Sequence, residues 1–157
     1  MMKNILVPVD GSEGADRAIE QAVTLAKICG AKLNFLYVAN INKLAEVCEA
    51  KLNFLYIANI NQLAINAVLS DAILDSVTKA GNVVLDRAME MVPEGIEKES
   101  FSDTGSPAVV VLDFAETNDI DLIVMGSRGL GVVKGVLLGS VSQYVVEQSK
   151  CPVLVVK

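Results

Sequence analysis

Short apolar runs alternate along the chain with longer segments in which apolar residues recur every three or four positions. The first run, Lys3–Asp10, is rich in Ile and Val and ends at Asp10-Gly11, a pattern typical of a buried parallel strand. The next segment has helical spacing between Ser12, a candidate N-cap, and Gly30, its expected stop. The pattern therefore predicts a strand followed directly by a helix.

The same alternation continues to the end of the chain. Further strands are predicted at Lys32–Asn40, Ile96–Phe101, Asp121–Gly126 and Pro152–Val156. Further helices are predicted at about Ala67–Val92, with Gly81 as a weak point, at Ser106–Asn118 with Ser at the N-cap, and at Ser140–Ser149. We expect the continuous apolar run of Asp121–Gly126 at the sheet centre and the alternating Ile96–Phe101 near an edge. This order predicts the α/β class: a single doubly wound parallel sheet with helices on both faces.

One stretch of the sequence is present twice. Residues 31–45 recur as 50–64 with a period of 19 and thirteen of fifteen positions identical, the exceptions being Val38/Ile57 and Lys43/Gln62. A repeat protein needs at least three units, so we interpret the two copies as one tandem duplication within a single domain. Both copies compete for one position beside the first strand. We expect the first copy to take it, because that arrangement keeps the short turn at Gly30.

Composition and charge narrow the classes of protein that the chain can be. A length of 157 residues with 52% apolar and 20% charged residues predicts one globular domain spanning 1–157. A net charge of −6 and scattered arginines argue against nucleic acid or an anionic membrane as partners. The absence of histidine excludes Ser-His-Asp and Cys-His catalysis and His-ligated metal sites. The short apolar N-terminal run and the spacing of the cysteines favour a cytoplasmic protein with free thiols.

A glycine-rich loop from Gly126 to Gly139 carries the clearest chemical signal. It follows a predicted strand and precedes a predicted helix, where backbone N–H groups and a helix N-terminus attract an anion. Hydroxyl groups and cations that suit a polyphosphate come from Ser127, Ser140, Ser142, Arg128 and Lys134. We expect a side chain at Gly126 or Gly139 to fill space that a phosphate needs. The Walker spacing is absent, so a purely structural turn is the alternative interpretation.

With its neighbours, this loop resembles the universal stress protein family and, more specifically, its ATP-binding branch. The family signature G-x2-G-x9-G-[ST] is matched by Gly126, Gly129, Gly139 and Ser140; other matching motifs are Asn4–Ser12, Gly105–Ala108, Asp121–Gly129 and Cys151–Val156. The resemblance covers nearly the whole chain, although the repeat departs from the family pattern. It implies an adenine-nucleotide alpha hydrolase-like sheet in the order 3-2-1-4-5, ATP between the first and fourth strands, and a homodimer through residues 152–156.

The resemblance also implies which residues bind the nucleotide. Pro8, Val9 and Asp10 would border the adenosine, with Asp10 towards the ribose or towards a Mg or Mn ion on the phosphates. The backbone of Val38, or of its copy Ile57, would meet the adenine. The residues around the triphosphate would be Met125, Gly126, Ser127, Arg128, Gly129, Gly139, Ser140, Val141 and Ser142. A simpler interpretation is that Asp10 and Ser12 only cap the first helix.

Three functions are open on the sequence alone. The first is an ATP-binding, dimeric regulatory protein with at most weak ATP hydrolysis, because Asp10 is the sole candidate to orient a water. The second is a dimeric scaffold or conformational switch whose site is altered by the duplicated segment. The third is an ATP-using enzyme of a related fold, although the chain has no histidine for adenylyl transfer. The sequence does not indicate a protein partner.

Overall fold

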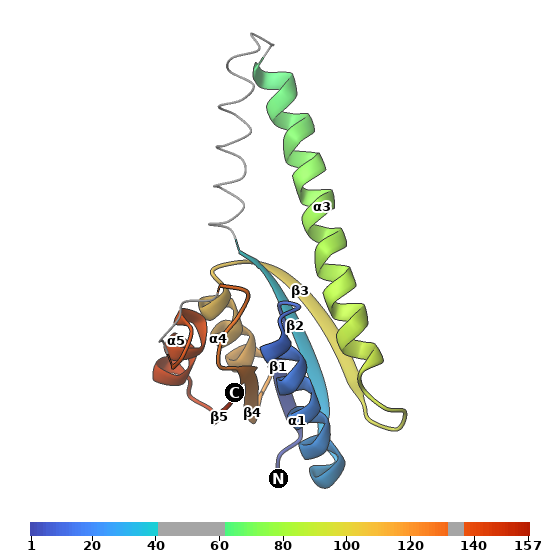
Figure 1. The fold of residues 1–157 in the computed structure, drawn as a ribbon, viewed down its shortest axis with the longest axis vertical. Helices are drawn as coiled ribbons and strands as arrows, with labels where there is room; N and C mark the ends of the chain where they lie inside the picture. The colour runs from blue at the N-terminus through green and yellow to red at the C-terminus, as the bar shows by residue number, and fades with distance from the viewer. Residues whose placement is uncertain (41–61, 132–136) are drawn as a thin grey trace.

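The computed structural model describes residues 1–40, 62–131 and 137–157, with 62–70 described by their backbone alone. Its centre is a parallel sheet of five strands in the order β3-β2-β1-β4-β5 (Figure 1). The strands are β1 Asn4–Pro8, β2 Lys32–Asn40, β3 Lys98–Gly105, β4 Leu122–Gly126 and β5 Val153–Val156. All neighbouring strands pair in parallel. The α/β class and the strand order are therefore confirmed.

Helices cover both faces of this sheet (Figure 1). The described helices are α1 Glu13–Cys29, α3 Gln62–Glu90, α4 Pro107–Thr117 and α5 Ser140–Gln148. Side chains of β1 alternate between two cores: Ile5 and Val7 face α1 and α3, whereas Leu6 faces α4 and α5. β4 lies between β1 and β5 and is buried at every residue, which explains its continuous apolar run. Among the described helices, none is long and apolar enough to cross a membrane.

Local capping signals set the ends of α1. The Ser12 Oγ accepts a hydrogen bond from the Ala15 N–H at 3.2 Å, and Gly30 adopts the left-handed conformation at the C-cap. Both residues were predicted in these roles. α4 begins as predicted, with Ser106 at the N-cap and Pro107 in the first turn, although the Ser106 side chain makes no capping hydrogen bond.

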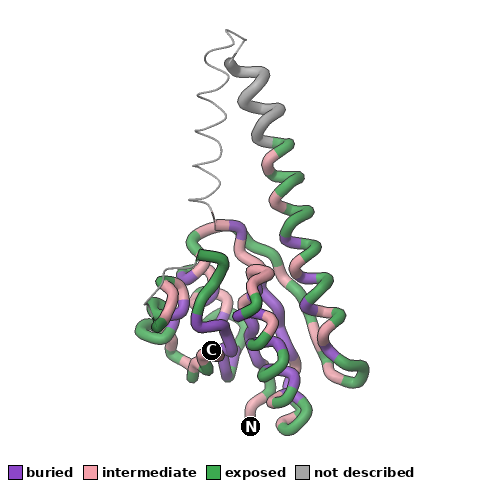
Figure 2. Tube along the Cα trace, in the orientation of Figure 1, coloured by how far each residue is buried: buried purple, intermediate pink, exposed green. Residues whose placement is uncertain are grey.

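Two elements differ by several residues from their predicted bounds, and strand pairing explains the difference for β3. β3 runs from Lys98 to Gly105 because it pairs with β2 along its whole length, from Leu33↔Lys98 to Asn40↔Gly105. α3 begins at Gln62 and continues through Gly81 without a break. Its N-terminal half extends beyond the sheet (Figure 1), and residues 71–80 are largely exposed there (Figure 2).

The first copy of the repeated segment forms β2, as predicted. Its Phe35 is fully buried, and the Asn34 Nδ2 donates to the Ile5 carbonyl oxygen at 3.3 Å. The Lys32 Nζ lies 2.9 Å from a Glu99 oxygen and 3.7 Å from a Glu97 oxygen, and the hydrogen bond to Glu99 raises the pKa of Lys32. Residues 41–61, which contain nearly all of the second copy, lie outside the described residues.

The amino-terminal end of the sheet is joined to β4 by Asp121. Its Oδ2 accepts hydrogen bonds from the backbone N–H groups of Lys3 at 2.7 Å and Asn4 at 2.9 Å. These two bonds stabilise the carboxylate and lower the pKa of Asp121 below its ordinary value of 3.8. The link holds the start of β1 beside the start of β4, opposite the end of the sheet at which the candidate site lies.

Candidate functional site

The candidate site is a cavity at the carboxyl ends of β1, β2 and β4, with a volume of about 520 Å³. The registered pairs between β1 and β4 are Ile5↔Leu122 and Leu6↔Ile123, although both strands continue further. Strand order reverses between these two strands, and their ends separate there. This is the position at which open α/β sheets bind ligands, and the volume is typical of a small-molecule site.

All but one of the residues that the family resemblance implied line this cavity. They are Pro8, Val9, Asp10, Val38, Met125, Gly126, Arg128, Gly129, Gly139, Ser140, Val141 and Ser142. Ser127 does not line it and instead holds the glycine loop in place. Its N–H donates to the Val156 carbonyl oxygen, and its own carbonyl accepts from the Gly139 N–H, both at 2.7 Å. Residues from several separate segments of the chain thus come together around the cavity, and Ser127 stabilises the glycine loop from outside the cavity.

The N-terminus of α5 forms one end of the cavity. Gly139 is the N-cap, and the N–H groups of the following residues, Ser140 and Val141, have no acceptor within the helix. The Ser142 hydroxyl is already engaged, because it donates to the carbonyl oxygens of Ser127 at 2.8 Å and Gly139 at 2.9 Å. Backbone N–H groups and the helix dipole, rather than the Ser142 hydroxyl, make this end suitable for an anion.

Gly126 has a packing role that the sequence analysis did not predict. A Cβ on Gly126 would lie 2.7 Å from the carbonyl carbon of Gly14 in α1, and a Cβ on Gly14 would lie 2.8 Å from the Arg128 carbonyl oxygen. The two glycines thus let α1 pack directly on the end of β4. A Cβ on Gly139 would make only ordinary contacts, the nearest at 3.5 Å. At Gly126 a Cβ would therefore conflict with α1, while the expectation that these glycines leave space for a phosphate stays a prediction.

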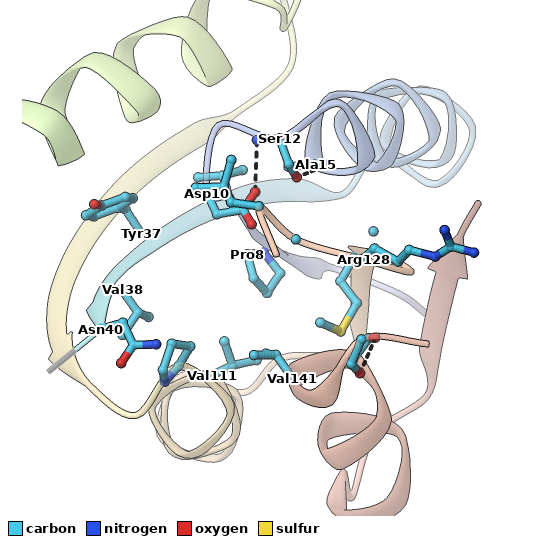
Figure 3. Close-up of a pocket in the computed structure, with 18 of the residues that line it drawn as sticks. Pro8, Asp10, Ser12, Ala15, Tyr37, Val38, Asn40, Val111, Arg128 and Val141 are labelled. Atoms are coloured by element: carbon cyan, nitrogen blue, oxygen red, sulfur yellow. Dashed lines mark hydrogen bonds between the residues drawn. The ribbon is translucent and has the colours of Figure 1, made fainter. Parts of the chain in front are cut away.

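Asp10 is held at the mouth of the cavity by its own loop (Figure 3). Its Oδ1 accepts from the Ser12 N–H at 3.0 Å. Its Oδ2 lies so close to Gly129 that a Cβ there would be 2.6 Å away. Ser12 caps the start of α1, whereas Asp10 accepts a hydrogen bond from the N–H of this N-cap residue and also lines the cavity. The capping interpretation and the binding interpretation are therefore compatible.

The opposite end of the cavity is mainly apolar. Val38 and Asn40 from β2 lie there with Val111 from α4, and Tyr37 lies on the side of α3 (Figure 3). Sequence reasoning did not assign most of this wall to the site. The missed lining residues of the whole cavity are Ser12, Ala15, Leu36, Tyr37, Ala39, Asn40, Val77, Pro107, Val111, Leu130 and Gly131. The expected position of Ser106–Pro107 after an edge strand was the one available signal, since helix starts gather at this end of such a sheet.

Arg128 is the cation of the glycine loop that the structure describes. It lines the cavity, but its guanidinium extends away from Asp10 and Val38 (Figure 3). Lys134 lies outside the described residues. The described residues also contain no group of three or more His, Cys, Asp or Glu side chains that could hold a metal ion. A metal ion here would need ligands from the bound molecule as well as from Asp10.

Comparisons with known proteins agree with this architecture. The model of the universal stress protein family matches residues 1–157. A universal stress protein of Bacillus subtilis is 35% identical, with 100% of each chain covered. The solved universal stress protein of Lactobacillus plantarum is 28% identical with a TM-score of 0.74, over 99% of this chain and 97% of that one. A universal stress protein solved in complex with cAMP is 26% identical with a TM-score of 0.59, over 99% and 96%. The chain therefore belongs to the universal stress protein family.

Proposed function

We propose that the cavity binds an adenine nucleotide, with ATP as the expected ligand, and that the protein acts as a nucleotide-responsive regulator. The observation that carries this proposal is the pairing of an apolar end, around Val38 and Val111, with the N-terminus of α5 in one cavity. A base suits the apolar end, and phosphates suit the free N–H groups of a helix start. The ribose would then pass beside Asp10.

The family comparison supports an adenine nucleotide in particular. The relative solved with cAMP shares the fold over almost its whole length. The signature residues Gly126, Gly129, Gly139 and Ser140 are present here and surround the α5 end of the cavity. We extend the proposal from a monophosphate to ATP because these glycines match the ATP-binding branch and leave the loop backbone open to several phosphates.

Mg²⁺ or Mn²⁺ would bind together with the phosphates. One oxygen of Asp10 is engaged by the Ser12 N–H, and the other lies at the cavity beside Gly129. A single carboxylate oxygen with several phosphate oxygens is the usual ligand set for Mg²⁺ on a nucleotide. Asp10 is also the group that would orient a water, so we propose weak ATP hydrolysis at most.

Titration calorimetry with ATP and Mg²⁺ tests the proposal, with one variant inside the cavity and one outside it. Gly129→Ala would place a Cβ 2.6 Å from the Asp10 Oδ2, whereas Asn82 is exposed on α3 and does not line the cavity. We expect Gly129→Ala to weaken ATP binding about tenfold, which corresponds to about 1.4 kcal/mol, and Asn82→Ala to leave it unchanged. Absence of ATP binding by the unmodified protein would refute the proposal. Equal effects of the two substitutions would refute the place assigned to Asp10.

We also propose that the protein forms a homodimer through residues 152–156. β5 lies at one edge of the sheet, and its Leu154 is 38% exposed. Two more apolar side chains, Tyr144 and Val146 of the adjacent α5, are exposed as well. Natural proteins usually cover a short apolar edge strand, because its unpaired backbone groups recruit other strands. A second copy of the same edge would cover it symmetrically.

A further inference from the structure

α3 approaches β2 very closely at one point, where Gly81 lies against the ring of Tyr37. A Cβ on Gly81 would lie 2.7 Å from the Tyr37 Cδ1 and 2.9 Å from its Cε1. These atoms belong to the middle of a ring that lines the cavity and packs against the core, so they cannot move aside as the tip of a flexible side chain could. Helix propensity alone favours Ala over Gly inside a helix. The glycine is therefore explained by the close approach.

The same face of α3 reaches the cavity one turn before Gly81. Val77 precedes Gly81 by four residues and so lies above it on the same face of the helix. Val77 lines the cavity together with Tyr37. One turn in the other direction, a Cβ on Gly11 would lie 3.2 Å from the Val84 Cγ2, so α3 also touches the loop that carries Asp10. The distance between α3 and the sheet at Gly81 thus sets how far Val77 enters the cavity.

We propose that Gly81 is a positioning residue for the nucleotide site: by seating α3 on Tyr37, it places Val77 as the wall of the cavity that closes over the base. The inference rests on the proposed nucleotide binding and adds a determinant of base preference to it. A purine extends further from the ribose than a pyrimidine, so it depends more on this wall. The α5 end of the cavity, which would hold the phosphates, has no contact with Gly81 or Val77 among its described partners.

The experiment compares the affinities for ATP and CTP, which share the ribose and the triphosphate. Gly81→Ala should lift α3 from Tyr37 and weaken ATP binding about tenfold, the factor expected from losing the burial of one aliphatic side chain. CTP binding should change by less than about threefold, on the same scale. Asn82→Ala is the matched control, because the neighbouring Asn82 is exposed and the change raises helix propensity without touching Tyr37. It should leave both affinities unchanged.

Repeating the Gly81→Ala substitution in a Tyr37→Ala variant distinguishes the positioning role of Gly81 from a general loss of stability. In Tyr37→Ala the ring is gone, so adding Gly81→Ala should have little further effect on the ratio of ATP to CTP affinity. An equal loss for ATP and CTP, or the same loss with and without the Tyr37 ring, would overturn the inference. If Gly81→Ala does not fold, Val77→Ala removes the wall directly, and an unchanged ATP-to-CTP ratio in that variant would overturn it as well. No ATP binding by the unmodified protein would refute the proposed function itself, whereas normal binding with an unaffected Gly81→Ala refutes only this inference.

Discussion

The duplicated segment offers a stringent test of which copy forms β2 in solution. Phe35 is the largest fully buried side chain of the described core and packs between the sheet and the helices α1 and α3. Its copy, Phe54, stands in the same local sequence, Leu-Asn-Phe-Leu-Tyr. Phe35→Ala and Phe54→Ala are thus chemically identical changes in identical neighbourhoods, and they differ only in which copy carries them.

The expected effects on stability differ by several kcal/mol. Phe35 has no exposed surface, so truncation to Ala removes its whole buried side chain and leaves a cavity, at a cost of about 3–5 kcal/mol. Phe35 fills the position beside β1, so Phe54→Ala leaves that position occupied and should cost less than about 1 kcal/mol. Urea denaturation followed by circular dichroism measures both free energies of unfolding.

Two outcomes would refute the reasoning. If Phe54→Ala were the more destabilising change, the second copy would form β2. If each single change lowered the free energy of unfolding only slightly but the double variant lost about 3–5 kcal/mol, either copy could form β2 when the other is altered. The predicted result is a large loss for Phe35→Ala that the additional Phe54→Ala does not greatly increase.

Three further predictions follow from other contacts. Gly126→Ala places a Cβ 2.7 Å from the Gly14 backbone, so it should lower the free energy of unfolding in urea by about 1–3 kcal/mol; stability equal to that of the unmodified protein would contradict the α1–β4 contact. Asp121 has a lowered pKa in the folded state, so its contribution to the free energy of unfolding is present above its ordinary pKa and is lost as the pH falls through the pKa of the folded state. Asp121→Asn removes this titration and should make the free energy of unfolding depend less on pH below about pH 4. An unchanged pH dependence in this range would argue against the role of Asp121. Leu154→Lys adds a charge to the exposed edge strand and should convert the proposed dimer into a monomer in sedimentation, whereas a dimer with unchanged affinity would place the interface elsewhere.

Local sequence patterns were sufficient to predict the order and the kind of the elements. The Ile- and Val-rich run before Asp10, the cap at Ser12 and the stop at Gly30 depend on residues close together in the chain, and each has the predicted role. The choice of the first copy for β2 was also predictable, since the short connection from α1 depends only on chain length around Gly30. Periodicity and capping are local properties, so they can be read without knowledge of partners.

Contacts between elements that are far apart in the chain became visible only in the folded structure. Gly126 packs against Gly14, and Gly81 packs against the ring of Tyr37. Asp121 accepts a hydrogen bond from the backbone N–H of Lys3. No local pattern identifies the partner in these pairs, because each arises only when a helix packs on the sheet or two strands become neighbours. The bounds of β3 likewise follow from its pairing with β2. Sequence motifs thus indicated which loop carries the candidate site. The packing of α1 and α3 on the sheet determines the shape of the cavity and explains the glycines at positions 126 and 81.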